Sequence, residues 1–364
     1  MLSEKTKSPV RLMYVITQSE LGGAQSVVLN LANYFARQAG YEVMIVSGPP
    51  GDAWKDLDAR IRVLYIKESR KKIGLQDIVV FLKMLRIRWT YRPDVVHLHS
   101  SKAGLLGRLV FPRKRIIYTV HGFDSVRLAF RIFLPLEQLF QTWAKYIVGV
   151  SHYDVQQMTN EGIRRTICIY NGIPDPMQQQ SKSADIQDVT KQLKALKQAG
   201  KFIVATIARF SKQKKFDLFC EIAAAYPDAL FVWIGNQTAP TGVVPDNVLC
   251  AGEVKAAYRL LPLIDLFILT SNYEGLPVSV IEALACGKPV VASNVGGTDE
   301  ILDGQNGFVL PNQASAFTEK IKQYQTDPSL YRQSCEAARN AYLHYFTIDH
   351  MCEEYEKLYS VISG

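Results

Sequence analysis

The sequence lacks any apolar run long enough to span a membrane. No stretch approaches the ~18 consecutive apolar residues that a transmembrane helix requires, and charged side chains interrupt the opening segment, where a signal peptide would need an apolar core. With 48% hydrophobic and 21% charged residues, the composition excludes a disordered or fibrous chain. We expect a cytoplasmic protein whose 364 residues form two globular domains.

The chain also lacks the common signatures of metal and cofactor sites. The six cysteines include no C-x-x-C pair, which argues against zinc and thiol exchange, and we expect reduced core thiols. His97 and His99 alternate on a predicted strand without a third ligand nearby, so we interpret them as structural. The D-x-D pair Asp56 and Asp58 falls in a segment expected to be an exposed helix. No G-x-G-x-x-G follows a predicted strand, which disfavours a dehydrogenase. We predict no metal ion and no cofactor.

Positive charge is concentrated in the first half of the sequence. The formal net charge is +8, yet residues 1–172 carry 25 basic against 13 acidic side chains, whereas the remainder carries 17 against 21. Basic clusters at 67–72, 85–92 and 107–115 lie beside apolar and aromatic residues such as Trp89. Cations next to insertable rings favour an anionic membrane surface. A solvated basic face around ordinary helices is the alternative, and no motif indicates nucleic-acid binding.

Short β-branched runs alternate with longer amphipathic stretches, which is typical of parallel sheets covered by helices on both faces. In the first half we expect strands at 11–17, 42–47, 62–66, 95–99, 115–120, 146–151 and 166–170, and helices at 23–39, 75–91, 103–111 and 135–145. After a polar segment, 174–200, we expect strands at 202–208, 230–235, 248–251, 266–270, 289–293 and 307–309, and helices at 216–225, 277–286 and 314–325. The pattern predicts an α/β protein of two Rossmann-like domains, whose ligands would bind at the carboxyl ends of the strands.

The domains are expected to divide close to residue 173. The first would comprise 1–173 and the second 174–344. An amphipathic stretch from about residue 331 to 363 is long enough for a final helix, at about 345–364, to cross back onto the first domain.

The loop after predicted strand 266–270 has the features of an anion-binding site. Glu274 lies in this loop, Gly275 allows close approach of the backbone to a ligand, and Pro277 suits the first turn of the next helix. The free amides of that turn would bind an anion. Glu282 lies a little over two turns later, inside an apolar run, where a carboxylate needs hydrogen-bond donors such as a ribose diol.

Two basic residues follow another predicted strand. Arg209 comes directly after 202–208, and Lys214 lies five residues later. Paired cations on a loop at a strand end suit a diphosphate, because a guanidinium can bind two of its oxygens at once.

In their order and placement, these segments resemble the retaining, GT-B-fold glycosyltransferases of family 4, the glycosyl transferases group 1 family. The resemblance covers nearly the whole chain. It includes LGGAQSVVLNLANYFARQAGYEV, PDVVHLHSSKAGLLGR, IIYTVHGFD, YIVGVSHYDVQQM, IYNGI, the basic pair, the E-x7-E of Glu274 and Glu282, and GKPVVASNVGGTDEIL. It implies two Rossmann-like domains facing each other across a cleft. The sequence departs from the family at Lys215, where Gly is usual, and at Pro174, where Asp is frequent.

The resemblance implies roles in the second domain, which would bind a nucleotide-sugar. Arg209 and Lys214 would hold the donor diphosphate and neutralise the charge of the leaving group. Glu282 would bind the ribose hydroxyls, and Glu274 would hold the transferred sugar. The donor site would be completed by the amides of Gly275 and Leu276.

The first domain would bind the acceptor. Gly23, at the start of the first helix, would contact the donor diphosphate, and Gly22 the acceptor. Lys102 and Arg108 would bind an acceptor phosphate. His121, after the fifth predicted strand, would lie near the reacting carbon and a hydroxyl of the donor sugar. The implied catalytic set is His121, Arg209, Lys214 and Glu274.

The family keeps the configuration of the anomeric carbon, through same-face attack without an enzyme nucleophile and without a metal. We therefore expect a hexosyl- or N-acetylhexosaminyltransferase that moves a sugar from a UDP-linked donor to a lipid-linked or saccharide acceptor in surface polysaccharide biosynthesis. It would associate peripherally with the inner face of the plasma membrane.

Two other functions compete with this expectation. The UDP-N-acetylglucosamine 2-epimerases have the same architecture, although the E-x7-E and the basic pair argue against an epimerase. A non-catalytic protein that binds membrane surfaces through its basic half would bind no nucleotide.

Overall fold

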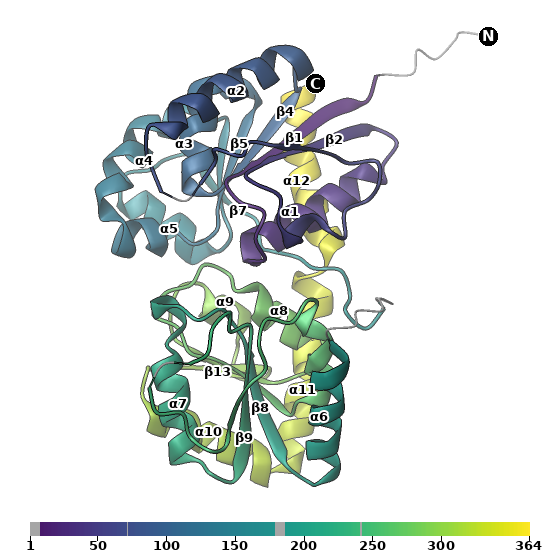
Figure 1. Ribbon diagram of the computed structural model, residues 1–364, viewed down its shortest axis with the longest axis vertical. Coiled ribbons are helices and arrows are strands. Elements are labelled where there is room, and N and C mark those ends of the chain that lie inside the picture. Colours follow the sequence, from purple (N-terminus) through teal and green to yellow (C-terminus); the bar gives the residue numbers. More distant parts are fainter. Residues whose placement is uncertain (1–7, 71, 179–185, 241) are drawn as a thin grey trace, which may run out of the picture. The chain divides into compact units, whose positions relative to one another are not determined.

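The computed structural model describes residues 8–70, 72–178, 186–240 and 242–364 (Figure 1). They form two compact units. The first comprises the chain up to Asn171 together with Ile348–Gly364, and the second comprises Gly172–Thr347. The predicted return of the C-terminal helix to the first unit is confirmed.

The first unit contains a parallel sheet in the order β3-β2-β1-β4-β5-β6-β7. Its strands are rich in Val, Ile and Leu because both faces of the sheet are buried. Helices α2 to α5 cover one face, and α1 and α12 cover the other (Figure 1). The strands are β1 (Val10–Ile16), β2 (Tyr41–Ser47), β3 (Arg62–Tyr65), β4 (Val95–His99), β5 (Ile116–Val120), β6 (Tyr146–Gly149) and β7 (Thr166–Cys168). The helices are α1 (Gly23–Ala36), α2 (Gln76–Tyr91), α3 (Ser101–Val110), α4 (Leu134–Phe140), α5 (His152–Asn160) and α12 (Ile348–Ser363).

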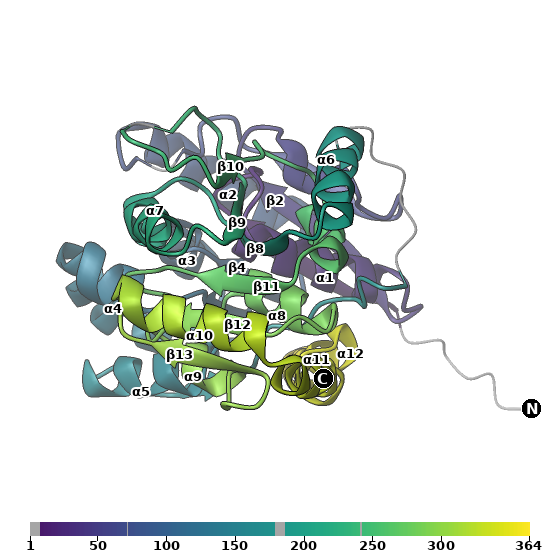
Figure 2. The same ribbon diagram turned by 90° about the horizontal axis from the view of Figure 1, so that it is seen from below.

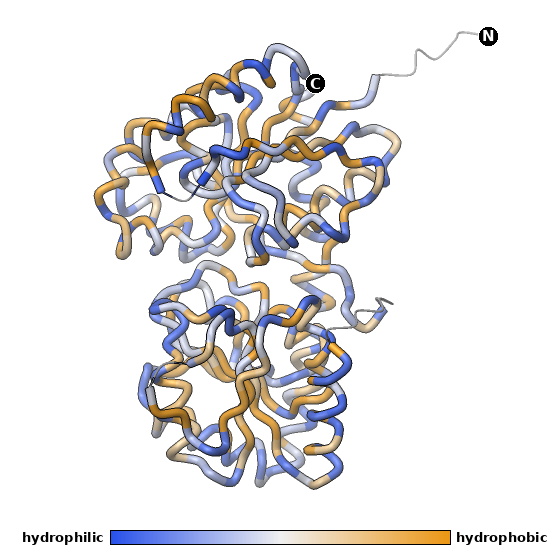
Figure 3. The backbone as a smooth tube through the Cα atoms, viewed as in Figure 1, coloured by the Kyte–Doolittle hydropathy of each residue, from blue (hydrophilic) through white to orange (hydrophobic). Residues whose placement is uncertain are grey.

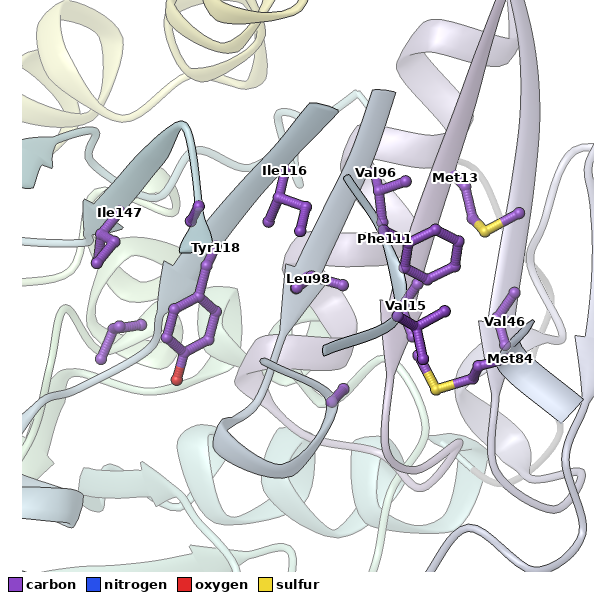
Figure 4. Close-up of a cluster of buried hydrophobic side chains, with 14 of the residues drawn as sticks. Met13, Val15, Val46, Met84, Val96, Leu98, Phe111, Ile116, Tyr118 and Ile147 are labelled. Carbon is purple, nitrogen blue, oxygen red and sulfur yellow. The ribbon is translucent and has the colours of Figure 1, made fainter. Parts of the chain in front are cut away.

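The core of this unit fixes α3 close to the sheet. Figure 4 shows apolar side chains of β1, β4 and β5 packed together, with Tyr118 among them. Gly104 of α3 lies so near that a Cβ there would be 2.4 Å from the Tyr118 ring. A Cβ at Gly107 would be 2.4 Å from Leu98. The two glycines therefore allow the close packing that places the start of α3 at the carboxyl end of β4.

The second unit contains a parallel sheet in the order β10-β9-β8-β11-β12-β13. Helices α7 and α10 cover one face, and α6, α8 and α11 cover the other (Figures 1 and 2). The strands are β8 (Phe202–Ile207), β9 (Ala229–Ile234), β10 (Val248–Cys250), β11 (Leu266–Leu269), β12 (Val290–Ser293) and β13 (Gly307–Leu310). The helices are α6 (Gln187–Gln198), α7 (Phe216–Ala225), α8 (Val278–Ala285), α9 (Thr298–Ile301), α10 (Ala314–Thr326) and α11 (Pro328–Tyr345). In both units the apolar strands occupy the centre (Figure 3).

All thirteen predicted strands are present, and two of the helical predictions need correction, those for α5 and for the D-x-D segment. Helix α5 was not predicted; it begins after Ser151, whose Oγ accepts the Asp154 amide at 3.0 Å. The C-terminal amphipathic stretch is two helices, α11 and α12, separated at Phe346 and Thr347, and α12 matches the final helix expected at about 345–364. The D-x-D segment is not helical beyond one short turn, because the Asp58 carboxylate accepts hydrogen bonds from the backbone and guanidinium of Arg60. No helix within the described ranges is long and apolar enough to cross a bilayer.

Candidate functional site

Two loops of the second unit are joined into one frame at the carboxyl ends of β8 and β11. These strands are neighbours at the point where the strand order reverses, which is where open α/β sheets bind ligands. The Asn272 amide donates to the Gln213 carbonyl at 2.8 Å, and Gln213 Nε2 donates to the Tyr273 carbonyl at 2.9 Å. Thr270 Oγ1 donates to the Lys214 carbonyl at 3.0 Å. The loop that carries Lys214 is therefore tied to the loop that carries Glu274.

Lys214 and Glu274 are in direct contact. Lys214 Nζ lies 2.5 Å from Glu274 Oε1, and Ser271 Oγ donates to the same oxygen at 2.5 Å. The carboxylate is only 6% exposed, so its charge depends on these two donors. The sequence placed both residues at one site, but it did not predict that they pair with each other. Ser271 is a site residue that the sequence analysis missed.

Arg209 lies at the same end of the sheet with its guanidinium unoccupied. It follows β8 directly and is exposed. Within the described residues its side chain has no hydrogen bond or ion pair. The next residue, Phe210, anchors the loop by packing on Phe216 and Trp233. Arg209 is thus a free cation on an anchored loop, as a ligand anion would require.

Glu282 is an unpaired carboxyl group on α8. The helix buries Ile281 and Leu284 beside it, while Glu282 itself is partly buried. Among the described residues no side-chain hydrogen bond or ion pair reaches the carboxyl group. Burial raises the pKa of Glu282 to about 8. A partly buried carboxyl group without donors is costly, which fits a group that is completed by a ligand.

The loop after β12 packs closely against the backbone at Glu274 and Gly275. Gly296 has a φ of 60°, and a Cβ there would lie 2.1 Å from the Glu274 carbonyl oxygen. The Gly297 amide donates to the Gly275 carbonyl at 3.0 Å. The two glycines thus allow two backbones to meet. The Gly275 amide donates to no acceptor within the described residues.

Ser293 and Asn312 fix the position of Ser271, the residue whose hydroxyl donates to Glu274. Ser293 Oγ accepts the Ser271 amide at 2.8 Å and donates to Asn312 Oδ1 at 2.5 Å. Asn312 Nδ2 in turn donates to the Ser271 carbonyl at 2.9 Å. This closed set of hydrogen bonds spans the ends of β11, β12 and β13, and it holds Ser271 in place.

In the first unit, three histidines gather at the ends of β4 and β5. His121 Nε2 lies 2.9 Å from His99 Nδ1, and their rings stack with centroids 5.2 Å apart. His97 contacts Tyr359 through Nδ1 and Thr119 through Nε2, both at 2.7 Å. Burial lowers the pKa of His121 to about 4 and the pKa values of His97 and His99 well below their usual range. All three rings are therefore neutral at physiological pH.

The predicted glycine turn lies at the start of α1. Gly22 is the N-cap of this helix, with extended backbone and no side-chain cap. No acidic residue occupies the first turn. The first turn of α1 therefore holds no carboxylate that would compete for an anion.

Comparison with known proteins decides the family. Residues 21–175 match the sequence pattern of the family described as "Glycosyltransferase Family 4". Residues 188–341 match that of the family described as "Glycosyl transferases group 1". The chain belongs to the family 4 glycosyltransferases. The two matches together cover most of the chain, one in each unit.

Two relatives of this glycosyltransferase are similar to it over nearly their full length. The UDP-Gal:alpha-D-GlcNAc-diphosphoundecaprenol alpha-1,3-galactosyltransferase of Escherichia coli is 23% identical, over 98% of each chain. The O-antigen biosynthesis glycosyltransferase WbnH of the same species is 23% identical, over 95% of this chain and 98% of that protein. Among solved structures, HepE of Anabaena in complex with UDP and glucose has a TM-score of 0.82 at 20% identity, covering 96% of this chain and 99% of HepE. The glycosyltransferase therefore has the GT-B fold.

Two residues expected to bind an acceptor phosphate are engaged elsewhere in the glycosyltransferase. Arg108 is 2% exposed, and its guanidinium pairs with Glu137 at 2.7 Å, so the predicted phosphate contact is wrong. Lys102 Nζ donates to the carbonyls of Arg70 and Lys72 and pairs with Asp77 at 2.5 Å. These contacts tie the ammonium group to the segment before α2 and to the first turn of α2, away from the role of a free phosphate-binding cation.

The two departures from the family pattern are accommodated locally. Lys215 has a left-handed φ of 42°, which explains why glycine is usual at this position. After Pro174, the next residue, Asp175, pairs with Arg339 of α11 at 2.6 Å.

Within the described residues, no group of three or more His, Cys, Asp or Glu side chains could hold a metal ion.

Proposed function

We propose that the protein transfers a sugar from a UDP-linked donor to a lipid-linked saccharide during surface polysaccharide assembly. The contact of Lys214 with Glu274, together with the exposed Arg209 at the start of the same loop, carries this proposal. A cation pair suits a diphosphate, and an adjacent carboxylate suits sugar hydroxyls. The E. coli relative is named for a UDP-Gal donor and a diphosphoundecaprenol acceptor, and HepE was solved with UDP and glucose.

In this reaction the second unit holds the donor. Arg209 and Lys214 bind the diphosphate, and their positive charge stabilises the nucleotide as it leaves. Because Lys214 is paired with Glu274, the arriving phosphate competes with that carboxylate for the ammonium group. Glu274 is then free to accept a sugar hydroxyl, beside the amides of Gly275 and Leu276.

Glu282 binds the ribose of the nucleotide. Its carboxyl group lacks donors in the described residues, and the two ribose hydroxyls would supply them. Binding then favours the ionised carboxylate, because hydrogen bonds to the charged form lower its pKa.

The first unit contributes His121 and the start of α1 to the reaction. His121 contacts a hydroxyl of the donor sugar, and Gly22 and Gly23 approach the diphosphate and the acceptor. The configuration of the anomeric carbon is retained. The nucleoside diphosphate helps to take up the acceptor proton, and the cations Arg209 and Lys214 supply the charge stabilisation that a metal would otherwise give.

The first unit also binds an anionic membrane, where a lipid-linked acceptor resides. Most exposed large apolar side chains of the described residues lie between 73 and 143, among them Leu82, Trp89 and Phe130. Figure 3 shows these apolar segments along α2 and around α4. Arg113 and Lys114 are exposed in the same stretch, without partners among the described residues. Rings and cations together favour an anionic interface.

A transfer assay tests the proposed reaction. Purified protein is incubated with labelled UDP-hexoses and UDP-N-acetylhexosamines, with and without bacterial lipid extract. We expect label in the lipid fraction only when extract is present, and transfer should persist in EDTA. Conversion of the donor without an acceptor would instead indicate an epimerase. Loss of transfer in EDTA that manganese restores would refute the metal-free reaction.

A further inference from the structure

His99 is a buried histidine with one ring nitrogen occupied and the other unpartnered. It is fully buried at the end of β4. Its Nδ1 contacts Nε2 of His121 at 2.9 Å, while its Nε2 has no hydrogen-bond partner among the described residues. Neighbouring His97 differs, because both of its ring nitrogens are bonded. Within the part of the chain that the structure describes, the His99 side chain therefore has one hydrogen-bond contact, with His121.

Two neutral imidazoles joined nitrogen to nitrogen share one proton, so the tautomer of each ring fixes the tautomer of the other. If His99 Nδ1 carries the proton, His121 accepts it at Nε2 and carries its own proton on Nδ1. If His121 Nε2 carries the proton, His99 must carry one on its unpartnered Nε2. That second arrangement buries an N–H group without an acceptor. Buried orphan N–H groups are rarer in native proteins than buried orphan acceptors.

We propose that His99 is a positioning residue that holds His121 in the neutral tautomer with its proton on Nδ1. His121 Nδ1 has no partner among the described residues, and the His121 side chain is partly exposed. A ligand oxygen would therefore meet a hydrogen-bond donor at His121 and not a base. This inference rests on the proposed function only in assigning the ligand, which is the donor sugar.

The surroundings of His99 hold it in this orientation. The His97 ring lies 4.0 Å from the His99 ring, centroid to centroid, and the His97 ring is fixed by Tyr359 of α12 and Thr119 of β5. The Tyr14 ring lies 5.9 Å from the His99 ring. His99 thus has little freedom to rotate its Nδ1 away from His121, and the C-terminal helix contributes to this rigidity.

The tautomer can be measured without any assay of transfer. The chain has six histidines, so the protein labelled with 15N-histidine gives few signals, which His121→Gln and His99→Leu would assign. We expect long-range 1H–15N spectra at neutral pH to show His121 protonated on Nδ1 and bare on Nε2. A proton on His121 Nε2 would overturn the proposal, whatever the enzyme transfers.

Two substitutions separate positioning from mere packing. His99→Asn keeps an N–H donor close to the place of Nδ1, whereas His99→Leu removes it. We expect His99→Leu to lower kcat about tenfold, the equivalent of one lost hydrogen bond, with KM for the donor changed less. His99→Asn should restore most of the rate and keep the Nδ1–H tautomer of His121.

The outcomes distinguish this inference from the proposed function. Equal rates for wild type and His99→Leu would overturn the positioning role while leaving sugar transfer established. Absence of transfer in the wild-type protein would overturn the proposed function, and the tautomer of His121 would still be decided by the spectra. If His99→Leu does not fold, the wild-type spectra and His99→Asn still decide the question.

Discussion

At the scale of a single residue, the carboxyl group of Glu282 makes the stability of the folded protein depend on pH. Its folded-state pKa of about 8 lies above the ordinary carboxyl value of 4.5 because the group is buried. The folded protein therefore binds more protons than the unfolded chain between these values. The contribution of Glu282 to stability therefore falls as pH rises through this window, and it levels off above the folded pKa.

Replacing Glu282 by Gln should remove this pH dependence. We expect the melting temperature of the nucleotide-free wild type to fall more steeply from about pH 6 to pH 9 than that of the variant, because Gln never ionises. Thermal unfolding at four pH values would show it. Parallel curves would mean that Glu282 is already ionised in the folded protein. The variant should also bind UDP more weakly, since it loses the ribose carboxylate.

Replacing Glu274 by Gln should separate binding from turnover. The Lys214 ammonium group loses the carboxylate that occupies it, so we expect UDP alone to bind about threefold to tenfold more tightly, the equivalent of about 1 kcal/mol for a partly buried pair. Sugar transfer should nevertheless fall, because the sugar loses its carboxylate contact. Calorimetric titration with UDP measures the first effect. Weaker UDP binding would show that Glu274 does not compete with the phosphate.

At the scale of single residues, sequence patterns identified the chemical groups but not their partners. Lys214 and Glu274 are 60 positions apart, and they meet only because β8 and β11 are neighbours in the sheet. Arg108 was expected to bind an acceptor phosphate, but it is buried and pairs with Glu137, in a helix 29 residues later. Ser271 could have been noticed as a hydroxyl three positions before Glu274.

Helices and strands were predictable to the extent that their apolar residues follow a period. The thirteen strands are short β-branched runs, and each was recognisable alone. Helix α5 has the sequence HYDVQQMTN, whose only aliphatic residues are Val155 and Met158, so no apolar stripe marked it. The final helix was expected at about 345–364, and α12 begins at Ile348, directly after the short break at Phe346 and Thr347.

The packing of α3 on the sheet leads to a prediction about stability. Gly104→Ala should lower the free energy of unfolding by about 1–3 kcal/mol, because the new methyl group would press on the fully buried ring of Tyr118. Gly40→Ala is the matched control, since a Cβ at Gly40 has no atom within 4 Å. Urea denaturation compares the three proteins. Equal stability of both variants would show that α3 can shift without cost.

For the whole molecule, the separation of charge between the two halves of the sequence predicts where a membrane would bind. Replacing Arg113 and Lys114 by Gln should weaken binding to anionic liposomes about tenfold or more, at about 1 kcal/mol for each cation. Added salt should reduce the difference. Replacing Lys191 and Lys194 of α6 changes the net charge equally in the second unit and should have no effect. Equal loss in both variants would place the membrane contact elsewhere.

The central claim is that Arg209, Lys214 and Glu274 form a binding site for a nucleoside diphosphate. Calorimetric titration of the full-length protein with UDP tests it most directly, with Lys214→Ala and the control Lys212→Ala. Lys212 is exposed two positions away, and its side chain has no partner among the described residues. We expect UDP to bind the wild type and Lys212→Ala alike, and Lys214→Ala at least about tenfold more weakly, since it loses a charged hydrogen bond. Equal affinity of all three proteins for UDP, or no binding by the wild type, would contradict the claim.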